Sequence, residues 1–179
     1  IDILEIGGHH KGKRGKDSEN KQPTLLILST LEDNNYPQYV KLHTLPNYKG
    51  EPIEEYLKEK CLFDPTIVIN CDRDKAFFCL NKLAQLENSV VDYTKENHKL
   101  KWLNTFIGNI QSNINHLYRL VKKRDLPLFL SEQEWRINHR YSGKRIMDKV
   151  KKYISMSTPV TFKQITNSVL AYEKQFLSA

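Results

Sequence analysis

The segment 66–77 constrains the fold more than any other part of the chain. The run from Thr66 to Asn70 has apolar and β-branched character, which predicts a buried strand of a parallel sheet. Asp72 and Asp74 follow directly, and a helix is predicted from about Lys75. Ligands of open α/β sheets gather beyond the carboxyl ends of strands, so an acid here is well placed to hold a metal. The alternative is that Asp72 or Asp74 caps the next helix, because aspartate is a favoured N-cap residue.

The predicted elements alternate between strands and helices before this segment and become helical after it. Five strands are expected, at residues 1–6, 24–31, 38–45, 66–71 and 89–93, the second and third forming an antiparallel hairpin. Two helices are expected between them, at 52–60 and 74–84. A long amphipathic helix then runs from Asn104 to Val121 and is broken at Leu126-Pro127. Later helices are expected after capping boxes at 131–134 and 161–164, and at 144–154.

Positive charge is concentrated in the second half of the chain. Residues 1–94 carry 12 basic and 15 acidic groups, whereas residues 95–152 carry 14 basic and 5 acidic groups. Such segregation is typical of a protein that binds the phosphate backbone of a nucleic acid. The alternative is a solvated, lysine-rich surface without a partner.

A glycine-rich basic loop is predicted at residues 7–16. Glycines allow a backbone to approach a ligand closely, and cations between them supply phosphate contacts. The spacing of a nucleotide-binding P-loop is absent. The expected phosphate contacts in this loop are Lys11, Lys13, Arg14 and Lys16, and those in the later basic segment are Lys122, Lys123, Arg124, Arg136, Arg140, Lys144 and Arg145.

Cysteine usage and hydropathy restrict the compartment. The three cysteines (Cys61, Cys71 and Cys79) lack a metal-binding spacing, which predicts free thiols in a reducing, intracellular compartment. No run of 18 apolar residues exists, so no membrane span or membrane partner is expected. The start at Ile1 fits removal of a mitochondrial transit peptide and equally well a trimmed chain.

Five short motifs occur in order along the chain. Asp2 stands shortly before Ile-Gly-Gly at residues 6–8, and residues 72–77 read Asp-Arg-Asp-Lys-Ala-Phe. The other three lie at residues 90–94, 104–106 and 134–140. Together they resemble the transposase domain of ISXO-like insertion sequences and their eukaryotic Merlin relatives. That family has an aspartate shortly before Ile-Gly-Gly and an Asp-Gly-Trp-Arg-Ala-Tyr segment that residues 72–77 match in spacing, and the other three similarities are weaker. The resemblance covers residues 1–141 and implies an α/β, ribonuclease-H-like fold: a mixed five-stranded sheet with flanking helices. Residues 142–179 are then a C-terminal helical extension.

The resemblance also implies an enzyme that cuts and joins DNA with two divalent metals. Such metals activate the attacking oxygen and stabilise the leaving one, and carboxylate oxygens suit magnesium or manganese. Asp2 and Asp72 match two of the family's ligands. The third position, a glutamate in many members and asparagine or arginine in some, falls on Ile107, which has no ligand atom. A slip of one helical turn would offer only asparagines: Asn104, Asn109 or Asn113.

Three functions therefore follow as hypotheses. The first is a repurposed, catalytically degenerate transposase fold that binds DNA or RNA and needs no cofactor. The second is an active strand transferase that uses Asp2, Asp72, an asparagine and magnesium or manganese. The third is a structural subunit of a large ribonucleoprotein, for instance a mitochondrial ribosome, in contact with other proteins.

Overall fold

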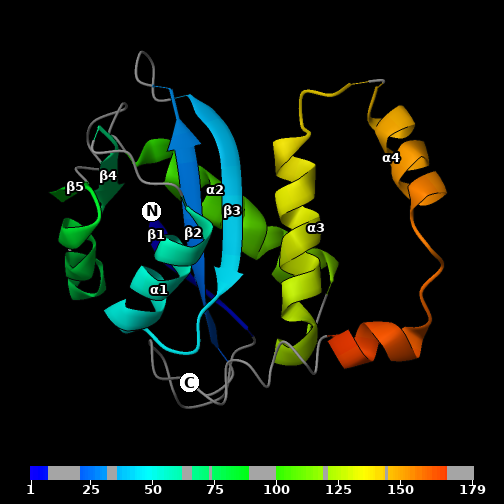
Figure 1. Ribbon diagram of the computed structural model, residues 1–179, viewed down its shortest axis with the longest axis horizontal. Helices are drawn as coiled ribbons and strands as arrows, with labels where there is room; N and C mark the ends of the chain where they lie inside the picture. The colour runs from blue at the N-terminus through cyan, green and yellow to red at the C-terminus, as the bar shows by residue number, and fades with distance from the viewer. Residues whose placement is uncertain are drawn as a thin grey trace.

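A computed structural model describes residues 1–7, 21–31, 36–61, 66–72, 74–88, 100–118, 121–143 and 145–168 (Figure 1). These residues form a mixed α/β structure, which confirms the predicted fold class at that level. The element order is strand, hairpin, helix, strand, short helix, strand and then helices. This order agrees with the prediction from the sequence.

The larger sheet is antiparallel and has the order β1-β2-β3. Its strands are β1 (Asp2–Ile6), β2 (Gln22–Thr30) and β3 (Pro37–Thr44). The predicted hairpin is confirmed, because Leu26 of β2 pairs with Leu42 of β3 in an antiparallel ladder. On the other side of β2, Leu26 pairs with Asp2.

The smaller sheet joins β4 (Val68–Cys71) and β5 (Gln85–Asn88) in parallel. The 3-10 helix η1 (Lys75–Lys82) connects them. In this region a hydrogen bond joins the backbone nitrogen of Ile1, next to β1, to the carbonyl of Asn70 in β4 at 2.8 Å. Within the described residues the strands thus form sheets of three and two, and the predicted single sheet of five is not observed.

One prediction about these strands needs correction, and another falls outside the described residues. The run before Asn70 is not buried throughout. Ile67, which precedes the ladder with β5, is 36% exposed, and Val68, the first paired residue of that ladder, is 41% exposed. The fifth strand was predicted at 89–93, but β5 ends at Asn88 and residues 89–93 lie outside the described part of the chain.

The helices beside the sheets are α1 (Gly50–Lys60), α2 (Lys101–Ser112) and α3 (Leu126–Asn138). Helix α2 continues as the π-helical turn η2 (Asn113–Leu117), and the 3-10 turn η3 (Lys123–Asp125) leads into α3. The capping box predicted at 131–134 is wrong. Pro127 lies in the first turn of α3, where a missing N–H costs nothing, and Ser131 lies inside the helix with its hydroxyl bonded to the Pro127 carbonyl at 2.9 Å.

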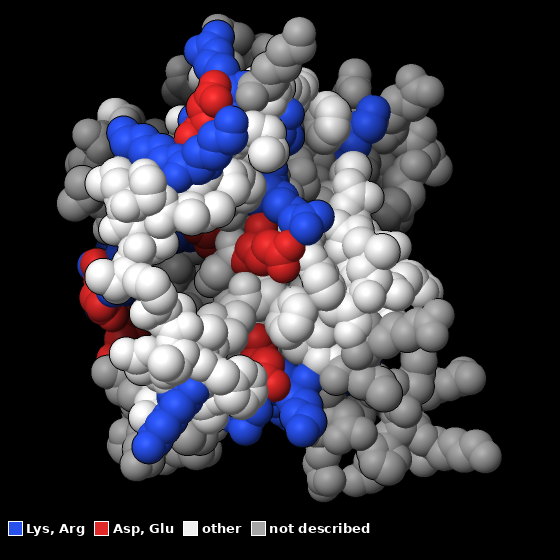
Figure 2. All heavy atoms as spheres, turned by 90° about the vertical axis from the view of Figure 1, so that its right-hand side faces the viewer, with Lys and Arg blue, Asp and Glu red and all other residues white. Residues whose placement is uncertain are grey.

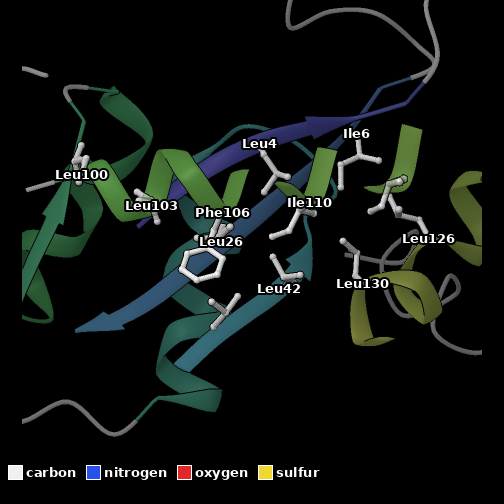
Figure 3. Packing of buried hydrophobic residues seen from close by; sticks show 12 residues of the cluster. Leu4, Ile6, Leu26, Leu42, Leu100, Leu103, Phe106, Ile110, Leu126 and Leu130 are labelled. Atoms are coloured by element: carbon white, nitrogen blue, oxygen red, sulfur yellow. The ribbon is translucent and has the colours of Figure 1, made fainter. Parts of the chain in front are cut away.

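The larger sheet separates two hydrophobic clusters. Leu26 of β2 faces the first cluster and its neighbour Leu25 faces the second, and both are fully buried. The first cluster lies against α2 and α3 (Figure 3) and includes Leu4, Ile6, Val40, Leu42, Leu103, Phe106, Ile110, Leu126 and Leu130. The second lies against α1 and η1 and includes Leu45, Ile53, Leu57, Phe77 and Leu80. The sheet therefore has helices on both faces.

The helical segments that the structure describes after Gly143 contain no buried residue. Helix α4 (Arg145–Met156) follows Gly143, whose φ of +49° favours glycine, and has no buried residue. Residues 162–168 are helical as well. The capping box predicted at their start is confirmed, because the side chain of Gln164 accepts from the backbone N–H of Thr161 at 2.7 Å and the Thr161 hydroxyl accepts from the N–H of Gln164 at 3.3 Å.

None of the helices formed by the described residues is long and apolar enough to cross a bilayer.

Substitution of alanine for two glycines, Gly50 and Gly108, should change the free energy of unfolding in opposite directions. A Cβ atom on Gly50 would lie 2.8 Å from the carbonyl oxygen of Ala76 and 2.9 Å from the Sγ atom of Cys79, so α1 and η1 would have to separate. We expect Gly50→Ala to lower the free energy of unfolding by about 1–3 kcal/mol. Gly108 lies in the exposed part of α2, where a Cβ meets nothing within 4 Å, and Gly108→Ala should raise it by about 0.5–1 kcal/mol. Urea unfolding of both variants measures this, and stabilisation by Gly50→Ala would contradict the close contact.

Stability should also fall in mild acid. The ring of His43 in β3 stacks on Tyr56 of α1, with centroids 3.9 Å apart, and burial lowers the pKa of His43 from 6.5 to about 4. Between these values the unfolded chain binds a proton that the folded chain does not, so stability is lost as pH falls. From about pH 7.5 to about pH 5, the wild type should lose on the order of 1–2 kcal/mol more than His43→Phe, which keeps the stack without titrating. Equal losses in urea unfolding would contradict this.

Candidate metal site and nucleic-acid surface

Asp2 and Asp72 lie at the corner where the two sheets meet. Asp2 is the first residue of β1, and Asp72 follows the last residue of β4. The bond from Ile1 to the Asn70 carbonyl holds these strand ends together. Both carboxylates act electrostatically on the Ile1 nitrogen, which places the two acids in one neighbourhood although 70 positions separate them.

Each acid near this corner also has a local structural contact. Oδ1 of Asp2 accepts from the backbone N–H of Ile3 at 2.7 Å, and Oδ1 of Asp72 accepts from the N–H of Asp74 at 3.0 Å. Asp74 is the N-cap of η1, because its Oδ1 accepts from the N–H of Ala76 at 3.0 Å. The N-cap alternative is therefore confirmed for Asp74, while Asp72 shapes the turn that precedes it.

Ile107, where the resemblance places the third metal ligand, lies on a helix face that is used for packing. Ile107 of α2 is half-buried and packs against the first hydrophobic cluster, beside Phe106 and Ile110. Of the three asparagines considered as substitutes, Asn113 donates to the Gln133 side chain at 2.9 Å, and Asn109 is exposed. No group of three His, Cys, Asp or Glu side chains able to hold a metal is found in the part of the chain that the structure describes.

One oxygen near the acidic corner was missed by the sequence reasoning. The Oδ1 atom of Asn70 is buried and has no hydrogen-bond partner among the described residues, which is uncommon for a buried amide. The signal in the sequence is an asparagine that ends an otherwise apolar strand. Two carboxylates and an amide oxygen are hard donors of the kind that magnesium or manganese binds. The oxygen donors of Asp2, Asp72 and Asn70 are therefore of the type that a divalent ion binds, and the third oxygen would come from Asn70 rather than from α2.

The late motif at 134–140 attaches α3 to the free edge of β3. The side chain of Asn138 accepts from the N–H of Val40 at 2.8 Å and donates to its carbonyl at 2.9 Å. Glu134 accepts from the N–H of Leu42 at 3.1 Å and pairs with Lys41 at 2.7 Å. These side chains replace a further strand as partners of the β3 backbone. We call this set of contacts the edge clamp.

Arg140 belongs to the edge clamp as well. Its guanidinium donates to the carbonyls of Pro37, Gln38 and Ile137 and lies 4.5 Å from the ring centroid of Tyr141. Sequence reasoning assigned Arg140 to phosphate binding, whereas in the structure its donors are directed to backbone oxygens.

The other predicted phosphate contacts differ in how they are held. Arg124 pairs with Asp125 at 2.9 Å, and Arg136 pairs with Glu132 at 2.6 Å. Lys122, Lys123 and Arg145 are exposed. Figure 2, which looks at the side of the molecule where α4 lies, shows cations in separate groups on a largely uncharged surface, with carboxylates beside several of them. The remaining candidates lie outside the described residues: Lys11, Lys13, Arg14, Lys16 and Lys144.

The edge clamp gives a direct stability prediction. Asn138→Ala leaves both backbone groups of Val40 without their partner and should lower the free energy of unfolding by about 1–3 kcal/mol. Asn109→Ala, at an exposed position of α2, is the matched control and should change it by less than about 0.5 kcal/mol. Chemical denaturation of the two variants measures the difference. Equal stability of the two would show that α3 does not hold the β3 edge.

Comparison with known proteins gives one family. The family model described as "ISXO2-like transposase domain" matches residues 4–138. The match ends at the last residue of α3 and leaves out α4. No curated protein and no solved structure matches the chain.

Proposed function

Because the chain belongs to the ISXO2-like transposase family, we propose that it binds nucleic acid through its basic surface and does not cut it. The proposal makes the chain a catalytically degenerate member of the family. It has two parts, the loss of strand cleavage and the retention of nucleic-acid binding, and different residues carry each part.

The packing of Ile107 carries the first part. Its hydrocarbon side chain stands where the resemblance places the third metal ligand, and it contributes to the first hydrophobic cluster. A metal held by Asp2 and Asp72 without a third carboxylate has less ligand charge around it than in the family's site, so it is bound more weakly and positioned less firmly.

The distribution of charge supports the second part. Residues 95–152 hold 14 basic and 5 acidic groups, and Lys122, Lys123 and Arg145 are exposed and able to meet phosphates. We assign further contacts to Lys11, Lys13, Arg14 and Lys16 of the glycine-rich loop, and to Lys144. Backbone contacts of this kind suit DNA and RNA alike.

The exposed ring of Tyr141 adds a surface for an unpaired base. Tyr141 is 69% exposed, lies against Arg140 and shares a hydrogen bond between hydroxyls with Tyr36. Tyr36 in turn meets the ring of Trp102 edge-on, with centroids 5.6 Å apart. Bases stack on such aromatic side chains without sequence preference.

A narrower form of the proposal places the chain in a ribonucleoprotein, such as a mitochondrial ribosome. Two features support it: the basic excess and the helices after residue 138, which the family match does not include. Under this form the chain binds structured RNA in preference to duplex DNA.

The second candidate function is an active, metal-dependent strand transferase, and the buried oxygen of Asn70 favours it. A magnesium or manganese ion held there would supply charge stabilisation to the attacking and leaving oxygens. In that case Asp2, Asp72 and Asn70 would hold the ion.

Binding across a salt series tests the proposal. We expect affinity for duplex DNA, structured RNA or a single strand to fall with salt at a log–log slope of about −0.7 to −0.9 for each phosphate contacted. Lys122→Glu/Lys123→Glu should weaken binding about tenfold or more, whereas Lys58→Glu/Lys60→Glu, with the same change in net charge on α1, should leave it nearly unchanged. The proposal would be contradicted if the affinity did not fall with salt and was the same in both double variants as in the wild type.

A cleavage assay with labelled DNA ends and magnesium or manganese separates the two candidates. We expect no cleavage or joining. Metal-dependent cleavage that Asp2→Ala or Asp72→Ala abolishes would overturn the degenerate interpretation, and loss of the same activity in Asn70→Ala would identify the third ligand.

A further inference from the structure

Helix α4 presents an apolar face that nothing in the described structure covers. Tyr153 is 56% and Ile154 is 68% exposed, and Val150 lies on the same side of the helix at a spacing of three and four residues. Monomeric proteins rarely leave contiguous apolar surface of this kind without a use. The family match ends at residue 138, so this face lies outside the transposase domain.

The apolar face of α4 forms one wall of a groove. Trp135 of α3 lies opposite Val150, Tyr153 and Ile154, and the groove between them has a volume of about 510 Å³. Trp135 is held in place because its ring stacks on His139, with centroids 4.5 Å apart. In Figure 1, α4 stands on the side of α3 that faces away from the sheets.

Lysines flank the apolar face on both sides. With about 100° per residue, Lys149 and Lys151 fall on opposite borders of the stripe that Val150, Tyr153 and Ile154 form. Residues 145–168 contain five cations and the single acid Asp148. A ligand of the groove therefore meets an apolar centre and positive borders.

We propose that the groove between α3 and α4 binds an amphipathic helix of a partner protein, one whose apolar ridge has Asp and Glu on its two borders. The ridge would insert beside Trp135, and its acids would pair with Lys149 and Lys151. This protein-docking function is additional to the proposed nucleic-acid binding and does not depend on that binding.

Shape and charge favour this partner over other occupants. A membrane surface is broad and favours an apolar face that stands clear of its neighbours, whereas Val150, Tyr153 and Ile154 share an open groove with Trp135 of α3. A second copy of α4 would bring like charges together, since α4 carries four cations and one acid. Helix-in-groove docking with complementary charge is an established mode of recognition.

Fluorescence anisotropy with the full chain and a labelled model peptide tests the proposal. The peptide has about 18 residues, or five helical turns, with leucines at i, i+3, i+4 and i+7 and glutamates on both borders. We expect saturable binding that Ile154→Glu weakens at least about tenfold. Met156→Glu is the matched control, because Met156 is 72% exposed but lies off the stripe, and it should bind like the wild type.

A charge exchange provides the sharper test. The double variant Lys149→Glu/Lys151→Glu should no longer bind the glutamate peptide. It should instead bind the same peptide with lysines in place of the glutamates more tightly than the wild type does. Equal binding of both peptides by the wild type would overturn the proposal, because it would show apolar adhesion without recognition. Binding only to phosphatidylserine vesicles, only to duplex DNA, or only to a second copy in sedimentation, sensitive in each case to Ile154→Glu, would overturn it in favour of that occupant.

Discussion

The packing of α2 on the three-stranded sheet is the interaction on which the rest of the molecule depends. Phe106 and Ile110 of α2 are buried against Leu4, Leu26 and other sheet residues (Figure 3). Burial of such side chains contributes about 1.5–3 kcal/mol each, so the rotation of α2 about its axis is fixed by its apolar stripe. Ile107, the next residue of the helix, then packs against the same cluster. A helix held in this way has the hydrocarbon side chain of Ile107 where the resemblance places a metal ligand.

The edge clamp extends the same structure to α3. Asn138, Glu134 and Arg140 all bond to the backbone of β3, which would otherwise present unpaired N–H and carbonyl groups. The family-like spacing at 134–140 thus has a physical reason in this chain that is independent of catalysis. Polar residues of a motif can be explained by the backbone groups that they hydrogen-bond, and here they attach the last turns of α3 to β3.

The sequence predicted the hairpin, the helices and the Asp74 cap well, because turn residues, periodicity and capping preferences are local. It failed where tertiary contacts decide. Pro127 was interpreted as the end of a helix, although it lies in the first turn of α3. The assignment of Arg140 to phosphate binding stays a prediction, but its hydrogen bonds to the carbonyls of Pro37 and Gln38 in β3 were not foreseen. The unpartnered oxygen of Asn70 could not be foreseen, since only the folded chain shows which amide lacks a partner.

The central claim is that packing of α2 has replaced the third metal ligand, and thermal unfolding of Ile107→Glu with manganese tests it most directly. Ile107→Gln is the control of equal size without the charge. We expect both variants to melt below the wild type without metal, because each puts a polar group against the first hydrophobic cluster. We expect manganese to raise the melting temperature of Ile107→Glu alone, and the rise to be lost when Asp72→Ala is added. An equal manganese-dependent rise in the wild type would contradict the claim, because the wild type would then already hold the metal.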